Sequence, residues 1–371
     1  MIMDTTSPSF SQRIIQGGWI GKIALALLSL GAVWWVGSKA IQSPALFYQQ
    51  IINGLQLGFV YALIALGYTM VYGIVRLINF AHGDVFMVGA FISYFAVSKF
   101  SLHVWPSSVF PGISATISVV LGTLTVVVLT MLLCALLAMV IERIAYKPLR
   151  TAPRISALIT AIGMSFFLEY FGALDFVFTP NFITYKRPFD ISIWYLKDGF
   201  HKLETGTSAP DGSVIFSNIL IIIILTSLFL VLSLNFFIMH TKIGKAMRAS
   251  SYDKPTSRLM GINVDGIISI TFAIGAALAG VGGILYATAY PSIFFWMGIT
   301  PGLKAFIAAV LGGIGNIPGA FLGALIMGQA EVLSAGYIST PMRDAIAFAI
   351  LILVLLVRPT GIFGEPEQEK A

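Results

Sequence analysis

Long stretches of this chain contain no Asp, Glu, Lys or Arg, and they dominate its pattern of hydrophobic and polar positions. Four of these uncharged runs are 104–141, 217–239, 266–303 and 305–330. About 20 apolar residues in a helix cross the hydrocarbon core of a bilayer, so runs of this length predict transmembrane helices. Alternating segments of about ten residues, which would indicate a transmembrane β-barrel, are absent.

The same pattern predicts an all-α polytopic membrane protein with about ten transmembrane or half-membrane helices, in a range of eight to ten. The expected segments are 19–37, 51–73, 84–98, 112–141, 156–178, 218–239, 266–290, 302–313, 318–336 and 342–357. Paired short segments interrupted by Gly or Pro indicate broken helices. We therefore expect discontinuous helices near 73–84 and 312–318.

The few charges predict how the chain lies across the membrane. Only 10% of residues are charged, against about a quarter in an average soluble domain. Segments 142–154 and 240–265 carry an excess of Lys and Arg, whereas 179–217 is balanced. Because cytoplasmic loops carry that excess, we place the two basic segments in the cytoplasm and 179–217 outside. With ten helices, both termini are then cytoplasmic.

The chain divides into a short N-terminal extension and one large domain. Residues 1–45 are interpreted as an extension with one extra transmembrane helix, although a cleaved signal peptide is an alternative there. Residues 46–364 form the predicted transmembrane domain, and 365–371 form a C-terminal tail. Within the domain, glycines four residues apart, such as Gly54 and Gly58, predict closely packed helices.

A polar cluster interrupts the apolar pattern at "INFAHGDVFMVGAF", residues 78–91. It contains Asn79, His82, Gly83 and Asp84. Ionisable groups inside membrane segments are costly and usually mark a pathway or a partner site. The alternative is a turn at the membrane surface in which Asp84 caps the next helix. The residues themselves leave both interpretations open.

A second interruption lies in "VLGGIGNIPGAFLG", around Gly312, Gly313 and Asn316. Non-helical backbone at membrane depth is tolerated only where protein buries it or water reaches it. This segment therefore predicts a break beside a translocation pathway, with a tight surface turn as the alternative.

The basic segment 240–265 combines cations with recurrent Met, Leu and Ile, which suggests contact with a soluble partner. The alternative is a solvated loop that sets the topology, which would explain the charge but not the apolar residues. The chain lacks the G-x-x-x-x-G-K-[ST] motif that cradles ATP phosphates. The single Cys and four scattered His residues form no metal-ligand spacing. We therefore expect no cofactor, no metal, no catalytic residue and no nucleic-acid partner.

Three blocks of the sequence resemble LivH-type permeases of branched-chain amino-acid ABC transporters. They are "NGLQLGFVYALIALGYTMVYGIVRLINFAHGD", "GKAMRASSYDKPTSRLMGINVDG" and "GLKAFIAAVLGGIGNIPGAFLGALIMGQAEVL" followed by "RPTGIFG". The resemblance covers about residues 49–364. The N-terminal extension and the enlarged 179–217 segment look like additions to shorter family members.

The resemblance implies a permease subunit in the plasma (inner) membrane of a prokaryote that hydrolyses nothing itself. Its partners would be membrane lipid, a second homologous permease, two cytoplasmic ATPases and a periplasmic or external substrate-binding protein. The basic segment would dock into an ATPase, with Lys245, Arg248, Asp253 and Gly261 as candidate contacts. The resemblance also favours a break near the permease interface, where Asn79 and Asp84 would hold the broken helix and line the path.

Two other functions remain open from the sequence. A related urea permease would show a similar pattern. A secondary transporter, in which His82 and Asp84 relay protons, would belong to a different class and would need no ATPase. The substrate cannot be read from the permease, because selectivity can reside in the external binding protein.

Overall fold

A computed structural model describes residues 31, 34–150, 152–204, 206–358 and 360–364 as a helix bundle. The helices that cross or enter the bundle are α3 (Pro44–Val75), α4 (His82–Ser98), α6 (Ala115–Ile141), α7 (Arg154–Gly172), α8 (Asn218–His240), α11 (Val264–Ala289), α12 (Ile299–Gly312), α13 (Ile317–Tyr337) and α14 (Arg343–Val357). Six described helices are long and apolar enough to span a membrane, and α4 and α12 are shorter apolar helices. The predicted all-α polytopic architecture is confirmed.

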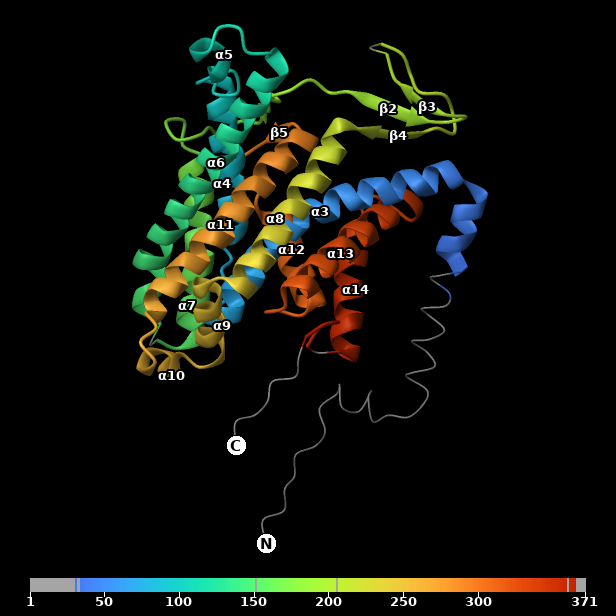
Figure 1. Ribbon diagram of the computed structural model, residues 1–371. Helices are drawn as coiled ribbons and strands as arrows, with labels where there is room; N and C mark the ends of the chain where they lie inside the picture. The colour runs from blue at the N-terminus through green and yellow to red at the C-terminus, as the bar shows by residue number, and fades with distance from the viewer. Residues whose placement is uncertain (1–30, 32–33, 151, 205, 359, 365–371) are drawn as a thin grey trace.

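The two ends of the bundle differ in structure (Figure 1). One end, here called the strand end, carries α5 (Trp105–Val109) and the strands β1 (Ile183–Thr184), β2 (Ile193–Leu196), β3 (Phe200–Lys202), β4 (Val214–Ser217) and β5 (Ser292–Ile293). The opposite end, called the basic end, carries η1 (Glu142–Tyr146), η2 (Lys147–Leu149), α9 (Lys242–Tyr252) and α10 (Lys254–Leu259).

The strands organise the 179–217 segment. Strands β3, β2 and β4 form an antiparallel sheet in that order, and β1 pairs with β5 from the segment after α11. The sheet is attached to the bundle where Gln49 Oε1 of α3 accepts a hydrogen bond of 2.7 Å from the Ile215 backbone N–H. Backbone N–H and C=O groups of this long loop are therefore hydrogen-bonded through strand pairing.

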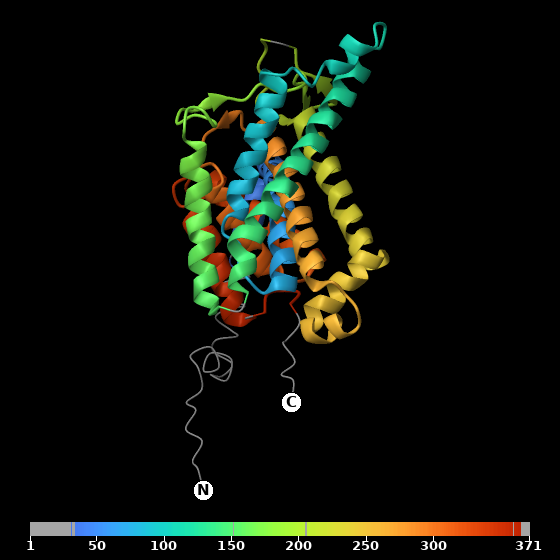
Figure 2. The same cartoon turned by 90° about the vertical axis from the view of Figure 1, so that its left-hand side faces the viewer.

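Helix α3 lies at the centre and the other long helices surround it. In the most apolar window of α3, 89% of residues are buried, and the figure for α11 is 72%. The corresponding shares are 28% for α6, 28% for α7 and 33% for α8. Figure 2 shows α7 and α8 on opposite flanks. Their outward apolar faces suit contact with lipid or with another membrane subunit.

The predicted close helix packing is confirmed at glycines. A Cβ on Gly328 of α13 would lie 2.5 Å from the backbone N of Gly58 on α3. A Cβ on Gly89 of α4 would lie 2.5 Å from Cα of Gly280 on α11. Only glycine, which has no side chain, permits two backbones to approach this closely. Such close packing stabilises helix contacts in lipid, where burying apolar side chains gives little gain.

An ion network joins segments at the basic end. Arg150 Nη1 lies 2.6 Å from Asp265 Oδ1 at the start of α11. Arg150 also pairs with the buried carboxylate of Glu142. The other Glu142 oxygen accepts a 2.6 Å hydrogen bond from Ser269. A buried charge of this kind requires partners, and here they bind the turn after α6 to α11.

Both predicted helix discontinuities are present. Helix α3 ends at Val75 and α4 begins at His82, while α12 ends at Gly312 and α13 begins at Ile317. The two breaks lie side by side, because a Cβ on Gly73 would stand 3.3 Å from Cα of Gly315. Sequence patterns 240 residues apart along the chain thus mark one region of the bundle.

Two expectations about helix ends differ from the structure or fall outside it. The helix expected over 156–178 ends at Gly172, because the apolar residues after it pack as a turn. Phe178 there stacks on Phe91 of α4, with ring centroids 4.3 Å apart. The extra helix expected over 19–37 lies mostly outside the described residues; residues 34–42 are helical.

Candidate functional site

Helix α4 begins inside the bundle. Its N-cap is Ala81, and Asp84 lies in its first turn with only 1% of its surface exposed. The Ser165 hydroxyl of α7 donates a hydrogen bond to Asp84 Oδ2, while Asp84 Oδ1 has no hydrogen-bond partner among the described residues. The surface-turn alternative, with Asp84 as the capping residue, does not describe this arrangement. Asp84 is a buried residue of a broken helix.

Helix α12 begins at the same place. A Cβ on Gly302 would lie 2.7 Å from Cα of Gly83, and a Cβ on Gly83 would lie 2.6 Å from the Gly298 oxygen. The first turn of α4 and the first turn of α12 therefore touch through backbone alone. Any larger side chain at these three positions would push the two helix starts apart.

A half-open cavity of about 190 Å³ lies beside this contact. It is called the acidic cavity here, because Asp84 of α4 and Glu169 of α7 line it together with Ser165. The carboxyl groups of Asp84 and Glu169 lie side by side. The remaining wall is formed by the start of α12 and by apolar and aromatic residues: Ile162, Phe166, Leu303, Phe306, Phe80 and Tyr68.

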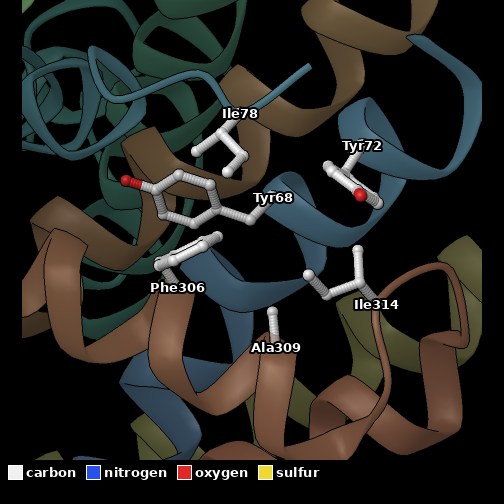
Figure 3. Close-up of a pocket in the computed structure, with 6 residues that line it drawn as sticks. All are labelled: Tyr68, Tyr72, Ile78, Phe306, Ala309 and Ile314. Atoms are coloured by element: carbon white, nitrogen blue, oxygen red, sulfur yellow. The ribbon is translucent and has the colours of Figure 1, made fainter. Parts of the chain in front are cut away.

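An aromatic pair separates the acidic cavity from a second, narrow pocket. The rings of Tyr68 and Phe306 meet edge to face with centroids 5.6 Å apart, and both residues line both spaces. Figure 3 shows the narrow pocket between this pair and Tyr72, Ile78 and Ile314. Ile78 and Ile314 belong to the two helix breaks. These features are thus adjacent in space in this order: the acidic cavity, the aromatic pair, the narrow pocket and the two breaks.

Asn79 and His82, the other predicted residues of the first break, do not line the acidic cavity. Asn79 Oδ1 accepts a 2.7 Å hydrogen bond from the Tyr146 hydroxyl of η1. The His82 ring packs edge to face on Tyr68, at 4.7 Å between centroids. Its Nε2 is buried without a hydrogen-bond partner among the described residues. These contacts hold the break in position.

The second break is held by the C-terminal "GIFG" segment. Backbone N–H groups of Ile362 and Phe363 donate to the Leu311 and Gly312 oxygens at the end of α12. Gly313 adopts a left-handed φ of 105°, which favours glycine. Asn316 Oδ1 accepts from Gly319 N at 2.9 Å and so caps α13, and its Nδ2 donates to the Phe363 oxygen at 3.1 Å. Thus Gly312, Gly313 and Asn316 shape the break.

The segment between α8 and α11 folds into two short helices. Asp253 caps α10 by accepting from Thr256 N at 3.1 Å, and Gly261 after it has a φ of 82°. Arg248 Nη2 donates to the Met239 oxygen at 3.2 Å, and Lys245 is exposed. Two apolar side chains at the tip are almost fully exposed, Leu259 at 87% and Met260 at 78%. A solvated loop does not need apolar residues at such a tip.

Lys254 connects this tip to the first break. Its Nζ donates a 3.1 Å hydrogen bond to the Val75 oxygen at the end of α3. Burial, followed by repulsion from Arg150, Arg76 and Arg258, lowers the pKa of Lys254 from its ordinary value. A displacement of α10 would therefore be transmitted directly to the end of α3.

Sequence reasoning missed a buried ion cluster between α12, α13 and α14. Lys304 of α12, 2% exposed, lies 2.6 Å from Glu331 of α13 and 2.7 Å from Asp344 of α14. Tyr61 of α3 donates a 2.9 Å hydrogen bond to Glu331. The available signal was Lys304 itself, which alone separates two uncharged runs. Ser165 and Glu169 were also missed, although Glu169 lies inside the expected segment 156–178, where an ionisable residue is itself a signal.

Comparisons with known proteins agree on one family. Residues 50–355 match the family described as "Branched-chain amino acid transport system / permease component". The high-affinity branched-chain amino acid permease LivH of Escherichia coli (strain K12) is 42% identical over 325 residues, covering 87% of this chain and 97% of that protein. The permease BraD of Pseudomonas aeruginosa is 41% identical over 324 residues, with 87% and 98% coverage.

A more distant relative extends this similarity. The probable LivH permease of Methanocaldococcus jannaschii is 25% identical over 345 residues, covering 89% of this chain and 93% of the relative. No solved structure shows a significant match to this chain.

Proposed function

This chain belongs to the permease family of branched-chain amino acid transport systems, and from that premise we propose that it forms a membrane pathway for branched-chain or other neutral amino acids in an ABC importer. The relatives are named as permease proteins of branched-chain amino acid transport systems, and the several apolar helices of this chain support a multi-pass location in the inner membrane. The acidic cavity where two broken helices begin carries the proposal.

The lengths of α4 and α12 support an intramembrane position for that cavity. With 17 and 14 residues at 1.5 Å per residue, they measure about 25 Å and 21 Å. Each is shorter than the hydrocarbon core of about 30 Å. Helix α4 runs from the cavity towards the strand end, where Ser93 meets Tyr185 at 3.1 Å. Helix α12 runs from it towards the second break.

In the proposed orientation the basic end faces the cytoplasm and the strand end faces outward, with both termini on the cytoplasmic side. The Lys/Arg excess at the basic end is the reason. Substrate then enters the acidic cavity, passes between Tyr68 and Phe306, and leaves through the narrow pocket beside the two breaks. Gly83 and Asp84 line this route, while Asn79, His82, Gly312, Gly313 and Asn316 hold its walls.

We further propose that α9 and α10 dock into a cytoplasmic ATPase. Leu259 and Met260 supply exposed apolar side chains on α10 and just after it, and Lys245 and Arg248 supply exposed charges on α9. Asp253 and Gly261 shape the α10 turn. Movement of the ATPases would reach the pathway through Lys254 and the end of α3. The complete transporter would contain this chain, a second homologous permease, two ATPases and an external binding protein.

Reconstitution tests the proposal against the ion-coupled alternative. The chain, its permease partner, the ATPases and the external binding protein are assembled in proteoliposomes, and uptake of labelled leucine, urea and an unrelated sugar is measured. We expect leucine uptake that requires enclosed or added ATP on the ATPase side. Uptake driven by an ion gradient in vesicles without the ATPases, or uptake of urea in place of leucine, would refute the proposal.

Asp84→Asn is expected to lower ATP-driven leucine uptake about tenfold or more, because a charge-assisted contact contributes about 1.5–3 kcal/mol. The matched control is Asp211→Asn in the strand-end loop. The Asp211 side chain is exposed, and only its backbone oxygen accepts from Lys197. The control should transport like the unaltered protein at equal expression. Equal losses in the two variants would remove Asp84 from the pathway.

A further inference from the structure

Two helix N-termini meet at the acidic cavity. Helices α4 and α12 run away from it in opposite directions, and their first turns touch through Gly83, Gly298 and Gly302. A helix N-terminus carries the equivalent of about half a positive charge. In broken membrane helices, such ends point at anionic groups of a substrate. The positive end of α4 already faces the carboxylate of Asp84, whereas the first turn of α12 opens into the cavity through Gly298 and Ile299.

The carboxyl groups of Asp84 and Glu169 favour a positively charged group or a proton in the same cavity. Like charges side by side repel, so this pair is stabilised when a cation or a shared proton joins it. Asp84 is 1% exposed, and its Oδ1 accepts no hydrogen bond from the described residues. A buried acceptor without a donor costs about 1–3 kcal/mol. One defined atom of the cavity, Asp84 Oδ1, is therefore left without a donor among the described residues.

The size and walls of the cavity restrict the ligand. At about 190 Å³, it is smaller than the roughly 300–1,000 Å³ of pockets for drug-sized molecules. Its other walls are aliphatic and aromatic, formed by Ile162, Phe166 and Leu303 among others. A small ligand with a cationic group, an anionic group and an apolar side chain matches these three surfaces.

We propose that the permease itself binds the zwitterionic head group of its amino-acid substrate in the acidic cavity, with the α-ammonium group on Asp84 and Glu169 and the α-carboxylate at the N-terminus of α12. This inference rests on the proposed function and deepens it, because it assigns part of the substrate recognition to the membrane subunit. The aliphatic side chain of the substrate lies against Leu303 and Phe166.

Thiol labelling at the cavity wall tests this assignment. Leu303 lines the cavity, is 39% exposed and has an aliphatic side chain without a polar group. Leu303→Cys is introduced into the complete membrane complex of permeases and ATPases, in proteoliposomes without the external binding protein. The buried Cys134 remains, and the unaltered chain measures its background. The rate of reaction with a small methanethiosulfonate reagent is then followed with leucine in the millimolar range.

Leucine is expected to slow labelling of Leu303→Cys. Two analogues should need about tenfold higher concentrations for the same protection. They are 4-methylpentanoate, which lacks the ammonium group, and 3-methylbutylamine, which lacks the carboxylate. Adding Asp84→Asn or, separately, Glu169→Gln should raise the leucine concentration needed for protection about tenfold. Each substitution replaces a carboxylate with an amide of nearly the same shape, so at least one of the two variants is expected to assemble normally.

Other results would overturn the inference. They are equal protection by all three compounds, unchanged protection in both carboxylate variants, or protection by sodium ions or by acidification with none by leucine. ATP-driven leucine uptake, measured in vesicles that also contain the binding protein, separates the two levels of the argument. Uptake without protection refutes the cavity assignment alone, whereas absence of leucine uptake refutes the proposed function.

Discussion

Replacing Lys304 with methionine is expected to destabilise the folded chain by up to about 3–5 kcal/mol, because removing one partner of a buried ion pair leaves the other charge poorly compensated. Lys304 is 2% exposed and lies 2.6 Å from Glu331 Oε1. Its loss would leave Glu331 with the Tyr61 hydroxyl and with Arg343, whose Nε is 3.6 Å away. Denaturant-induced unfolding of the purified protein in detergent measures the change.

Two further variants distinguish this buried pair from an ordinary lysine. Lys147 forms a more exposed pair with Asp265 at 3.9 Å, so Lys147→Met should cost less than about 1 kcal/mol. The double variant Lys304→Met with Glu331→Met should be more stable than Lys304→Met alone, since it removes the stranded charge. Similar midpoints for Lys304→Met and Lys147→Met would show that the buried network contributes no more than a surface pair.

The consequence of losing this pair extends to the pathway. Lys304 lies two residues after Gly302, which touches the start of α4, and on the same short helix as Phe306 of the aromatic pair. Its bonds to α13 and α14 fix where α12 begins. The ion pair therefore positions α12, which is too short to span the membrane by itself.

Changing Leu259 and Met260 together to aspartate is expected to abolish most ATP-driven uptake, by about tenfold or more, since a few apolar anchors carry most of an interface energy. At 87% and 78% exposure, both side chains are free of packing in the described chain. The fold should therefore survive the change. Co-purification of the ATPases with the permease pair measures docking, and uptake in proteoliposomes measures coupling.

A matched pair of exposed apolar residues at the strand end is the control. Val109 and Phe110 are 56% and 58% exposed beside α5. Changing both to aspartate should leave ATPase co-purification intact, because this end lies opposite α9 and α10 (Figure 1). If the Leu259 and Met260 variant still retains its ATPases, or if the strand-end variant loses them equally, the docking surface has been placed at the wrong end.

The helix bundle and its two breaks were predictable because they depend on the membrane environment and on local sequence. Uncharged runs indicate membrane helices whatever packs against them, and Gly and Pro interrupt a helix through their own backbone properties. This is why the ranges 73–84 and 312–318 were expected as breaks and are confirmed as interruptions between helices. The end of α7 was less predictable, because Phe178 is as apolar in a turn as it would be in a helix.

The candidate site was only half predictable for a related reason. Asp84 stands out in sequence since ionisable groups are rare in membrane segments. Glu169, which faces it, lies 85 positions away on another helix, and no local pattern connects the two. The partners of Lys304 on α13 and α14 are hidden in the same way, because they lie on two other helices and no local pattern connects them to Lys304.

By itself, the sequence determined that this chain lies in a membrane and which segments form most of its helices. It also determined where two helices break and to which family the chain belongs. Each of these depends on local composition or on similarity along the chain. Only the tertiary structure decided that the starts of α4 and α12 touch, that Asp84 meets Ser165 and Glu169 around one cavity, and that Lys304 pairs with Glu331 and Asp344. Burial and charge pairing are properties of several helices together, so they exist only once the helices have packed.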